Sequence, residues 1–333
     1  MKTTITDVAK EAGVSMKTVS RVLNNEPNVA KATRDRVMEA ADRLDYSPNL
    51  AARGLASSRS YLIALIYDNP SPSYISNLQR GAVAACRANG YHLVLDPMRS
   101  ETAHGDTIES RLRRLGVDGV VIAPPLSNAG PLREAVVKLG LDHALIGPSD
   151  PADRQAVLMD DAEASRQMTQ HLIELGHTEI GFIEGPSDHS SSAQRLRGFR
   201  AAMEGAGLSV TPDHVRRGDF TFASGVEAAQ ALLGSPASRP TAIFASNDDM
   251  AAGTMQVAAR LGLDVPGDLS VCGFDDTPIA RMVWPQLTTV AQPIRRMGEV
   301  AVAMLIDRSR HEEPRVQTLD FDLVIRDTTA APG

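Results

Sequence analysis

The chain has 333 residues, of which 43% are hydrophobic and 23% charged, proportions typical of a soluble protein with a few globular domains. No apolar run approaches the ~20 residues that a membrane span needs, and the N-terminus lacks the basic and apolar regions of a signal peptide. Cys86 and Cys272 lie in separate apolar segments, which favours buried thiols over a disulfide. We therefore expect a cytoplasmic protein that has no membrane partner.

The net charge of −7 is unevenly distributed along the chain. Residues 1–60 contain ten Lys and Arg against seven Asp and Glu, a net +3, which leaves −10 for the remainder. A basic head on an acidic body suits a protein that contacts DNA through its head only. The total charge taken alone would argue against nucleic-acid binding.

The segment 1–48 has the pattern of short helices separated by turns. Thr6 can cap a first helix, and Gly13 can end it in the left-handed conformation. Ser15 can cap a second helix, and a third is expected over residues 33–44. The second helix shows a polar face made of Met16, Lys17, Ser20 and Arg21. This arrangement is typical of a helix-turn-helix with its recognition helix in the major groove; the alternative is an ordinary helical hairpin.

From Tyr61 onward, apolar runs of strand length alternate with amphipathic stretches of helix length. The expected strands cover residues 62–67, 92–95, 119–123, 144–146, 156–159, 179–183, 242–245 and 269–273. The expected helices include residues 74–89, 162–175, 193–206 and 249–261. Because the strands lack polar alternation and helices join them, we expect two doubly wound parallel sheets, each buried on both faces. Several strands end in polar or turn residues, so a ligand cleft at their carboxyl ends could carry several carboxylates.

The chain resembles the LacI/GalR family of bacterial repressors along essentially its whole length. The matching segments are residues 7–9, 13–15, 18–24, 46–49, 55–56, 195–199, 247–248 and 273–276. The resemblance implies an α/β protein with an all-α helix-turn-helix domain, a hinge helix and a periplasmic-binding-protein-like core of two subdomains. The implied boundaries are 1–48 for the DNA-binding domain, 49–60 for the hinge helix and linker, 61–158 plus 290–313 for the first core subdomain, and 159–289 plus 314–328 for the second. The final strand is expected near residues 316–326, and the chain would cross between the subdomains three times.

The resemblance also implies how the head contacts double-stranded operator DNA. Met16, Lys17 and Arg21 would reach base edges, where Arg and Lys favour guanine. The residues expected at phosphates are Thr4, Ser15, Thr18, Ser20, Asn24 and Thr33. The remaining residues expected at the DNA are Ile5, Thr6, Tyr46, Asn49, Ala52 and Ala56.

Residues 50–56 resemble the family's hinge helix, which enters the minor groove beside that of a second subunit. Leu55 would then wedge open a central base step, although a plain apolar linker residue is the alternative. So short a helix is not stable alone in water, so it is expected to fold on DNA. Gly54 departs from the family pattern and costs about 1 kcal/mol relative to Ala in a helix, which weakens hinge folding.

The core pocket is expected to hold a small effector, with Arg195 and Asp275 as its principal charged groups. Arg195 precedes the Gly198-Phe199 pair, as in the family pattern, and Arg197 is the competing candidate. Carboxylates together with an Arg fork suit vicinal hydroxyls, because each group can make two hydrogen bonds. The other residues expected at the effector are Asp68, Asn69, Tyr74, His189, Ser191, Phe220, Asn247 and Asp248.

His189 and Ser191 stand where the purine-responding members carry Arg and Thr, so a sugar or glycoside is favoured over a purine. Trp284 is expected near the mouth of the cleft, with core packing as the alternative for Trp284 and Phe222. The sequence names neither the effector nor whether it releases or promotes DNA binding.

Catalysis is not expected, because the His residues are scattered and no HExxH, CxxC pair, P-loop or GxSxG motif occurs. No metal and no cofactor are predicted. We expect a homodimer on a palindromic operator, and the chain ends at Gly333 without the heptad tail of tetrameric members. A solute-binding protein and a sugar-processing enzyme are the alternative functions, and the helical head argues against both.

Overall fold

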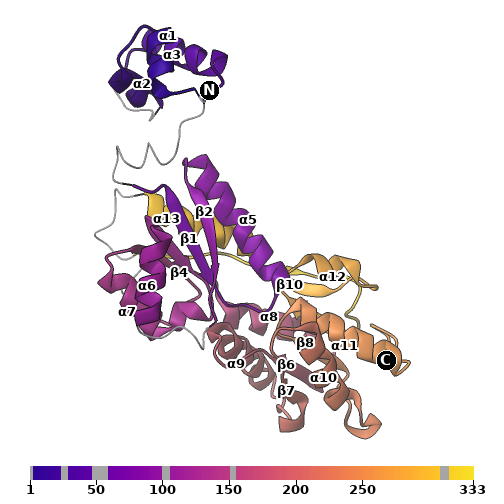
Figure 1. Cartoon of the computed structure of the whole chain (residues 1–333). Helices are drawn as coiled ribbons and strands as arrows, with labels where there is room; N and C mark the ends of the chain where they lie inside the picture. The colour runs from indigo at the N-terminus through magenta and orange to yellow at the C-terminus, as the bar shows by residue number, and fades with distance from the viewer. Residues whose placement is uncertain (1–2, 24–28, 47–58, 100–105, 151–154, 308–314) are drawn as a thin grey trace. The chain divides into compact units, whose positions relative to one another are not determined.

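A computed structural model of the chain describes residues 3–23, 29–46, 59–99, 106–150, 155–307 and 315–333. The polypeptide forms two compact units, residues 1–61 and 62–333. In its described residues the first unit is helical, and the second contains two sheets flanked by helices (Figure 1).

The first unit, here called the head, is built from three described helices packed around one small core. The helices are α1 (Ile5–Glu11), α2 (Met16–Leu23) and α3 (Lys31–Arg43). Their core consists of the buried residues Val8, Ala9, Ala12, Val19, Val22, Val37, Ala40 and Ala41. Gly13 has φ +61°, so the turn after α1 uses the left-handed conformation expected of it.

Thr4, not Thr6, is the N-cap of the first helix, so the prediction of Thr6 as its cap was wrong. The Thr4 backbone N–H donates to the Asp7 carboxylate at 2.9 Å, and the Thr4 hydroxyl donates to the same oxygen at 2.7 Å. These two bonds lower the pKa of Asp7. The Ser15 cap is confirmed, because Ser15 Oγ accepts from the Thr18 backbone N–H at 3.2 Å. The third helix starts two residues earlier than predicted.

The first sheet of the second unit is parallel throughout, in the order β11-β5-β4-β3-β1-β2. Its strands are β1 (Leu62–Tyr67), β2 (His92–Pro97), β3 (Gly119–Ile122), β4 (Asp142–Ile146), β5 (Gln155–Leu158) and β11 (Val316–Thr318). Helices α6 (Asp106–Leu115) and α7 (Gly130–Lys138) cover one face, where their apolar residues form one cluster with those of the strands. Helices α5 (Pro72–Ala88) and α13 (Ile294–Ile306) pack together on the sheet's other side.

The second sheet has the order β12-β10-β9-β8-β6-β7 and is parallel except for the antiparallel pair β10–β12. Its strands are β6 (Ile180–Glu184), β7 (Val215–Arg217), β8 (Ala242–Ala245), β9 (Ser270–Phe274), β10 (Thr288–Ala291) and β12 (Asp322–Val324). The helices packed against it are α8 (Asp161–Glu174), α9 (Ser190–Gly205), α10 (Phe222–Leu233) and α11 (Asp248–Arg260). The short elements are α12 (Pro278–Met282) and the 3-10 turns Leu126–Asn128, Pro212–His214 and Pro236–Ser238.

The two parallel-dominated sheets confirm the predicted fold class, and β3, β8 and β9 are buried along their whole length. Cys86 and Cys272 are buried free thiols.

The prediction that one final strand belongs to the second subdomain was wrong. Two short strands form instead, β11 on the first sheet and β12 on the second, so the third crossing lies between them. β7 and β10 were not predicted, because they are short and carry polar residues.

Gly198 allows helices α8 and α9 to approach closely, because a Cβ at this position would lie 2.0 Å from the Ala162 carbonyl oxygen. We predict that Gly198→Ala lowers the free energy of unfolding of the second unit by at least 1–3 kcal/mol through overpacking against backbone. Gly205, at the end of the same helix, has open space around its Cβ position. Gly205→Ala should therefore be neutral or stabilising by up to about 1 kcal/mol. Urea denaturation measures both, and equal losses would contradict the close-approach explanation.

Candidate functional site

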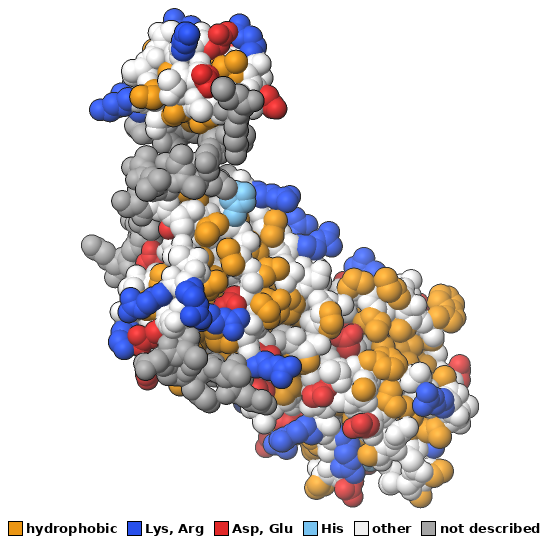
Figure 2. All heavy atoms as spheres, viewed as in Figure 1, with side chains coloured by type: hydrophobic (Ala, Val, Ile, Leu, Met, Phe, Trp, Pro, Cys, Tyr) orange, Lys and Arg blue, Asp and Glu red, His pale blue; other side chains and the backbone are white. Residues whose placement is uncertain are grey.

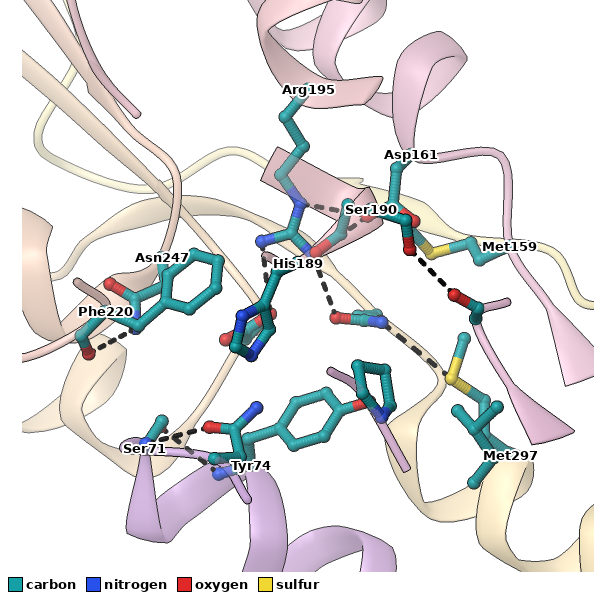
Figure 3. A pocket seen from close by; sticks show the side chains of 17 residues that line it. Ser71, Tyr74, Met159, Asp161, His189, Ser190, Arg195, Phe220, Asn247 and Met297 are labelled. Atoms are coloured by element: carbon teal, nitrogen blue, oxygen red, sulfur yellow. Dashed lines mark hydrogen bonds and ion pairs between the residues drawn. The ribbon is translucent and has the colours of Figure 1, made fainter. Parts of the chain in front are cut away.

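A pocket lies between the two sheets of the second unit, at the carboxyl ends of their strands (Figure 3). Its empty volume is about 550 Å³, part of it open to solvent. The first subdomain contributes the start of α5 and the loop after β4, and the second contributes the start of α9 and the ends of β8 and β9. The lining residues are Asn69, Ser71, Tyr74, Pro124, Ile146, Gly147, Met159, Asp161, His189, Ser190, Ser191, Arg195, Phe220, Asn247, Asp275, Gln292 and Met297.

Arg195 is the central charged group of the pocket, and its side chain is only 4% exposed. Its Nε and Nη2 both lie 2.9 Å from Asp161 Oδ1, and Nη1 donates to the Ser246 carbonyl oxygen. Nη2 also donates to Gln292 Oε1 at 3.4 Å, and the guanidinium carbon lies 3.6 Å from the centre of the Phe274 ring. Hydrogen bonds, an ion pair and an aromatic face together compensate for the burial of this cation.

Asp275 brings a second carboxylate into the pocket on a tight turn after β9. Its Oδ1 is buried, accepts no hydrogen bond from the described residues, and lies 4.0 Å from Arg195 Nη1. Burial raises the pKa of Asp275 well above its usual value, an effect that the Arg195 charge opposes. Asp275 and Asp276 have φ of +116° and +50°, and Arg281 and Arg326 hold the Asp276 carboxylate. Non-glycine residues in this conformation carry strain and often occur at functional sites.

Two further buried polar atoms in this region have no partner among the described residues, His189 Nε2 and Ser192 Oγ. His189 Nδ1 lies 3.0 Å from Asp188 Oδ1, and its ring meets the Phe220 ring edge to face at 5.3 Å. Burial lowers the pKa of His189, so a neutral imidazole is favoured. Phe220 has φ +66°, and Asn247 Nδ2 holds its carbonyl oxygen at 2.9 Å. A buried polar atom without a hydrogen bond destabilises the protein. A ligand that forms the missing hydrogen bonds removes this cost, and its binding is favoured accordingly.

Asp248 does not line the pocket, contrary to its prediction as an effector contact. Its Oδ1 accepts from the Thr289 hydroxyl at 2.6 Å, and its Oδ2 accepts from the Thr277 backbone N–H at 2.7 Å and hydroxyl at 3.1 Å. Burial raises the pKa of Asp248 to about 7. This carboxyl therefore ties the start of α11 to β10 and to the loop that carries Asp275, where it supports the pocket from behind.

The structure brings most of the predicted effector residues together. Those that line the pocket are Asn69, Tyr74, His189, Ser191, Arg195, Phe220, Asn247 and Asp275. Asp68, half-buried at the end of β1, is not among the lining residues but acts electrostatically on His189. The competing candidate Arg197 is exposed and does not line the pocket. Trp284 is also absent from the lining and is 86% exposed.

Asp161 and Gln292, the side-chain partners of Arg195, were not among the predicted site residues. Asp161 is one of the polar residues that follow the expected strand 156–159. This position at a strand end is the sequence signal by which it could have been predicted. Gln292 follows β10, a strand that was not predicted. Asp161 and Gln292 stand where the chain crosses between the two sheets, close to the subdomain boundaries that the resemblance implied at 158/159 and 289/290.

Two serine hydroxyls join the subdomains across this cleft. Ser71, at the start of α5, donates to Asp249 Oδ2 on α11 at 2.8 Å. Ser190, at the start of α9, donates to the Gly147 carbonyl oxygen after β4 at 2.8 Å. The structure therefore shows the two subdomains hydrogen-bonded to each other around the pocket.

In the head, α2 presents a polar face to solvent. Met16, at the start of α2, is 54% exposed, Lys17 is exposed, and Ser20 and Arg21 are half-exposed. Ser15 and Thr18 form a mutual hydroxyl contact of 2.9 Å at the start of the helix. Of the other polar residues predicted at the DNA, Thr4 and Thr6 are exposed and Thr33 is half-exposed.

Ile5 and Tyr46, also predicted at the DNA, pack partly against the core of the head. The predictions for Asn24, Asn49, Ala52, Gly54, Leu55 and Ala56, and the hinge helix as a whole, lie outside the described residues. A helix long and apolar enough to cross a bilayer is absent from the described ranges.

Comparisons with known proteins agree with both units. Residues 4–49 match bacterial regulatory proteins of the lacI family, and residues 169–329 match a periplasmic binding protein-like domain. The HTH-type transcriptional regulator DegA of Bacillus subtilis (strain 168) is 35% identical over 99% of both chains. Among solved structures, the lac repressor dimer bound to operator and the anti-inducer ONPF has a TM-score of 0.82 and 29% identity, covering 99% of this chain and 100% of the other. The transcriptional regulator CelR in complex with cellobiose has a TM-score of 0.74 and 31% identity, covering 98% and 100%.

A helix-turn-helix head together with a two-sheet ligand-binding core defines a DNA-binding transcriptional regulator. The chain belongs to the LacI family of bacterial regulatory proteins. The relatives that it matches over nearly their whole length are transcriptional regulators rather than enzymes.

Arg195 and Arg197 provide a direct test of the pocket's electrostatics. We predict that Arg195→Ala lowers the free energy of unfolding of the second unit by about 3–5 kcal/mol, because it leaves buried carboxylates without their cation. Arg197→Ala, two residues further along α9 and exposed, should stay within about 0.5 kcal/mol of the parent protein. Urea denaturation at pH 7 measures both; similar losses would show that the buried ion pair does not support the fold.

Proposed function

We propose that the protein is a repressor of carbohydrate-utilisation genes that binds a palindromic operator as a homodimer. A sugar or glycoside in the pocket sets its affinity for the operator, and the protein works in the cytoplasm on the nucleoid. The observation that carries the effector assignment is a group of buried polar atoms in and beside the pocket that have no hydrogen-bond partner among the described residues, Asp275 Oδ1, His189 Nε2 and Ser192 Oγ. Such groups favour a ligand with many hydroxyls, each able both to donate and to accept.

The chemistry of the lining supports a sugar. Asp161 and Asp275 accept hydrogen bonds from hydroxyl groups, and a neutral His189 offers either a donor or an acceptor. The rings of Tyr74 and Phe220 provide apolar area for the carbon faces of a sugar ring. The CelR structure, a relative with the same fold, holds cellobiose. His189 and Ser191 in place of the Arg and Thr of purine-responding members disfavour a purine.

The effector would act by stabilising the closed arrangement of the two subdomains. A ligand that bonds to both Asn69 and Asp275 joins the loop after β1, in the first subdomain, to the loop after β9, in the second. Because the chain crosses between the subdomains three times, closure is a hinge motion of two connected bodies. A coupling of about 1–3 kcal/mol between the pocket and the operator gives a change in affinity of about 5–150-fold.

Recognition of the operator is tested by selecting sequences from random duplex DNA at about physiological salt, where nonspecific phosphate binding is suppressed. A palindrome should be enriched, and the selected duplex then serves as the probe for sugars that raise or lower affinity. If no sequence is enriched with or without candidate sugars, the head does not read an operator and solute binding becomes the better explanation.

On the selected duplex, we predict that Arg21→Ala and Lys17→Ala each weaken binding by about 1–3 kcal/mol and relax the base preference at one position of each half-site. The reason is that each side chain supplies base-edge donors from the exposed face of α2. Lys138→Ala, which removes a charge from the second unit, is the control and should leave affinity within twofold. Fluorescence anisotropy measures all three, and a uniform loss across operator sequences would assign Lys17 or Arg21 to phosphates instead.

The homodimer is supported by an apolar surface at α12. Trp284 and Met282 are 86% and 80% exposed, and Figure 2 shows hydrophobic side chains gathered over this region. Large exposed apolar side chains of this kind mark interaction sites, and Trp is enriched among the residues that dominate binding energy. A second copy of the chain is the occupant that a palindromic operator requires.

We predict that Trp284→Ser raises the dimer dissociation constant at least tenfold while leaving the unfolding of the second unit unchanged, because Trp284 makes little contact within its own subunit. Phe222→Ser on α10, where the side chain is 40% exposed, is the control and should dimerise normally. Sedimentation equilibrium measures both, and an unchanged constant for Trp284→Ser would place the interface elsewhere.

A further inference from the structure

Three methionines expose their side chains in the part of the chain that the structure describes. Met16, Met38 and Met282 are 54%, 44% and 80% exposed, and the other described methionines are buried. Met282 belongs to the apolar surface at α12 that the proposed homodimer covers. In the dimer, the thioethers that an oxidant in solution can reach are therefore those of Met16 and Met38, because packing shields a buried sulfur atom.

Met16 begins helix α2, and its sulfur atom is held at the surface of the head. The exposed hydroxyl of Thr6, on α1, donates to Met16 Sδ at 3.3 Å. The buried core of the head is built from Val and Ala side chains, so Met16 is not needed to fill it. A chemical change at Met16 would therefore alter the surface of the head and leave its core intact.

Met16 shares the exposed face of α2 with polar and cationic side chains. Lys17 is exposed, and Ser20 and Arg21 are half-exposed on the same helix. Lys and Arg reach base edges through hydrogen bonds, whereas a thioether offers apolar contact, for which the C5-methyl group of thymine is the matching group in the major groove. Met16 is thus the member of this face whose contribution depends on its being apolar.

We propose that Met16 is an oxidation site through which a peroxide reversibly weakens operator binding. This inference rests on the proposed function, because it assumes that α2 contacts the operator. The modification is the sulfoxide of Met16, and the oxidant is hydrogen peroxide or an organic hydroperoxide. The head then responds to an oxidant independently of any effector in the second unit.

The oxidation transfers one oxygen atom to the sulfur of Met16. Sδ attacks one oxygen of hydrogen peroxide, so that an S–O bond forms and the O–O bond breaks. The proton on the transferred oxygen passes to the departing hydroxide, which leaves as water. Sulfur is oxidised by two electrons to the sulfoxide, and the peroxide is reduced.

The sulfoxide differs from the thioether in the property that the operator contact uses. Its oxygen is a strong hydrogen-bond acceptor, whereas a thioether sulfur is a weak one. Placed against a base edge that offers an apolar contact, this oxygen leaves water without gaining a donor. The Thr6 hydroxyl, which already contacts the sulfur, can donate to the oxygen and hold the oxidised side chain against α1. We expect operator affinity to fall about 5–100-fold.

The test treats the full-length protein with hydrogen peroxide, removes the excess with catalase and maps the sulfoxides by peptide mass spectrometry. Fluorescence anisotropy on the selected operator duplex then gives the affinity. Oxidation at Met16 should lower affinity by the stated factor. The two methionine sulfoxide reductases, one for each sulfoxide epimer, should restore it in the presence of dithiothreitol. Dithiothreitol alone should not, whereas it would reverse a disulfide formed by Cys86 or Cys272.

Variants locate the effect at one sulfur atom. Met16→Leu keeps an apolar side chain without an oxidisable sulfur, so peroxide should change its affinity less than twofold from its own untreated value. Met16→Gln, which is polar like the sulfoxide, should bind the operator about 5–100-fold more weakly than the parent protein without any treatment. Met38→Leu and Met282→Leu are the matched controls, because each removes an exposed thioether elsewhere, and both should lose affinity on treatment as the parent does.

The outcomes separate this inference from the proposed function. If the parent protein oxidised at Met16 binds within twofold of the untreated protein, the oxidation site is overturned while operator recognition stands. The same holds if Met16→Leu loses as much affinity as the parent, or if Met38 is oxidised under conditions that leave Met16 unchanged. If the untreated protein selects no operator, recognition by α2 and the oxidation site both fall.

Discussion

The buried guanidinium of Arg195 is the interaction on which the arrangement of the core depends. A cation removed from water is stable only if its surroundings replace the lost hydration, and here every partner comes from a different part of the chain. Asp161 stands at the first crossing between the sheets, Gln292 at the second, and the Ser246 carbonyl at the end of β8. The hydrogen bonds of Arg195 therefore fix the crossing segments relative to the strand ends, and this arrangement gives the pocket its shape.

The organisation of the fold was predictable because periodicity and turn chemistry are local properties. Uninterrupted apolar runs such as residues 242–245 showed a sheet buried on both faces, and Gly13 and Ser15 located the turn between α1 and α2. The final strand was misassigned for a physical reason. Residues 316–318 and 322–324 are equally short and neither strand contains a buried residue, so nothing in their own pattern shows which sheet each will join.

The pocket was predictable in part, for a related reason. Strand ends identified Asn247 and Asp275, because parallel strands bring their carboxyl ends to one edge. The same rule selected Asp248 wrongly, since adjacent residues at a helix start point in different directions, and Asp248 faces Thr277 and Thr289. Whether a polar side chain faces a cavity or supports it from behind depends on its tertiary neighbours, which sequence spacing does not contain.

The serine bonds of Ser71 and Ser190 have a consequence for how such a regulator changes during evolution. Each joins the rims of the cleft through a single hydroxyl, and a typical hydrogen bond contributes only about 0.5–1.5 kcal/mol to stability. Ser71 itself lines the pocket, but its acceptor Asp249 does not, so substitution of Asp249 removes this bond between the subdomains while every lining residue is kept. Substitutions can thus change the concentration of effector at which the protein responds without changing which effector it recognises.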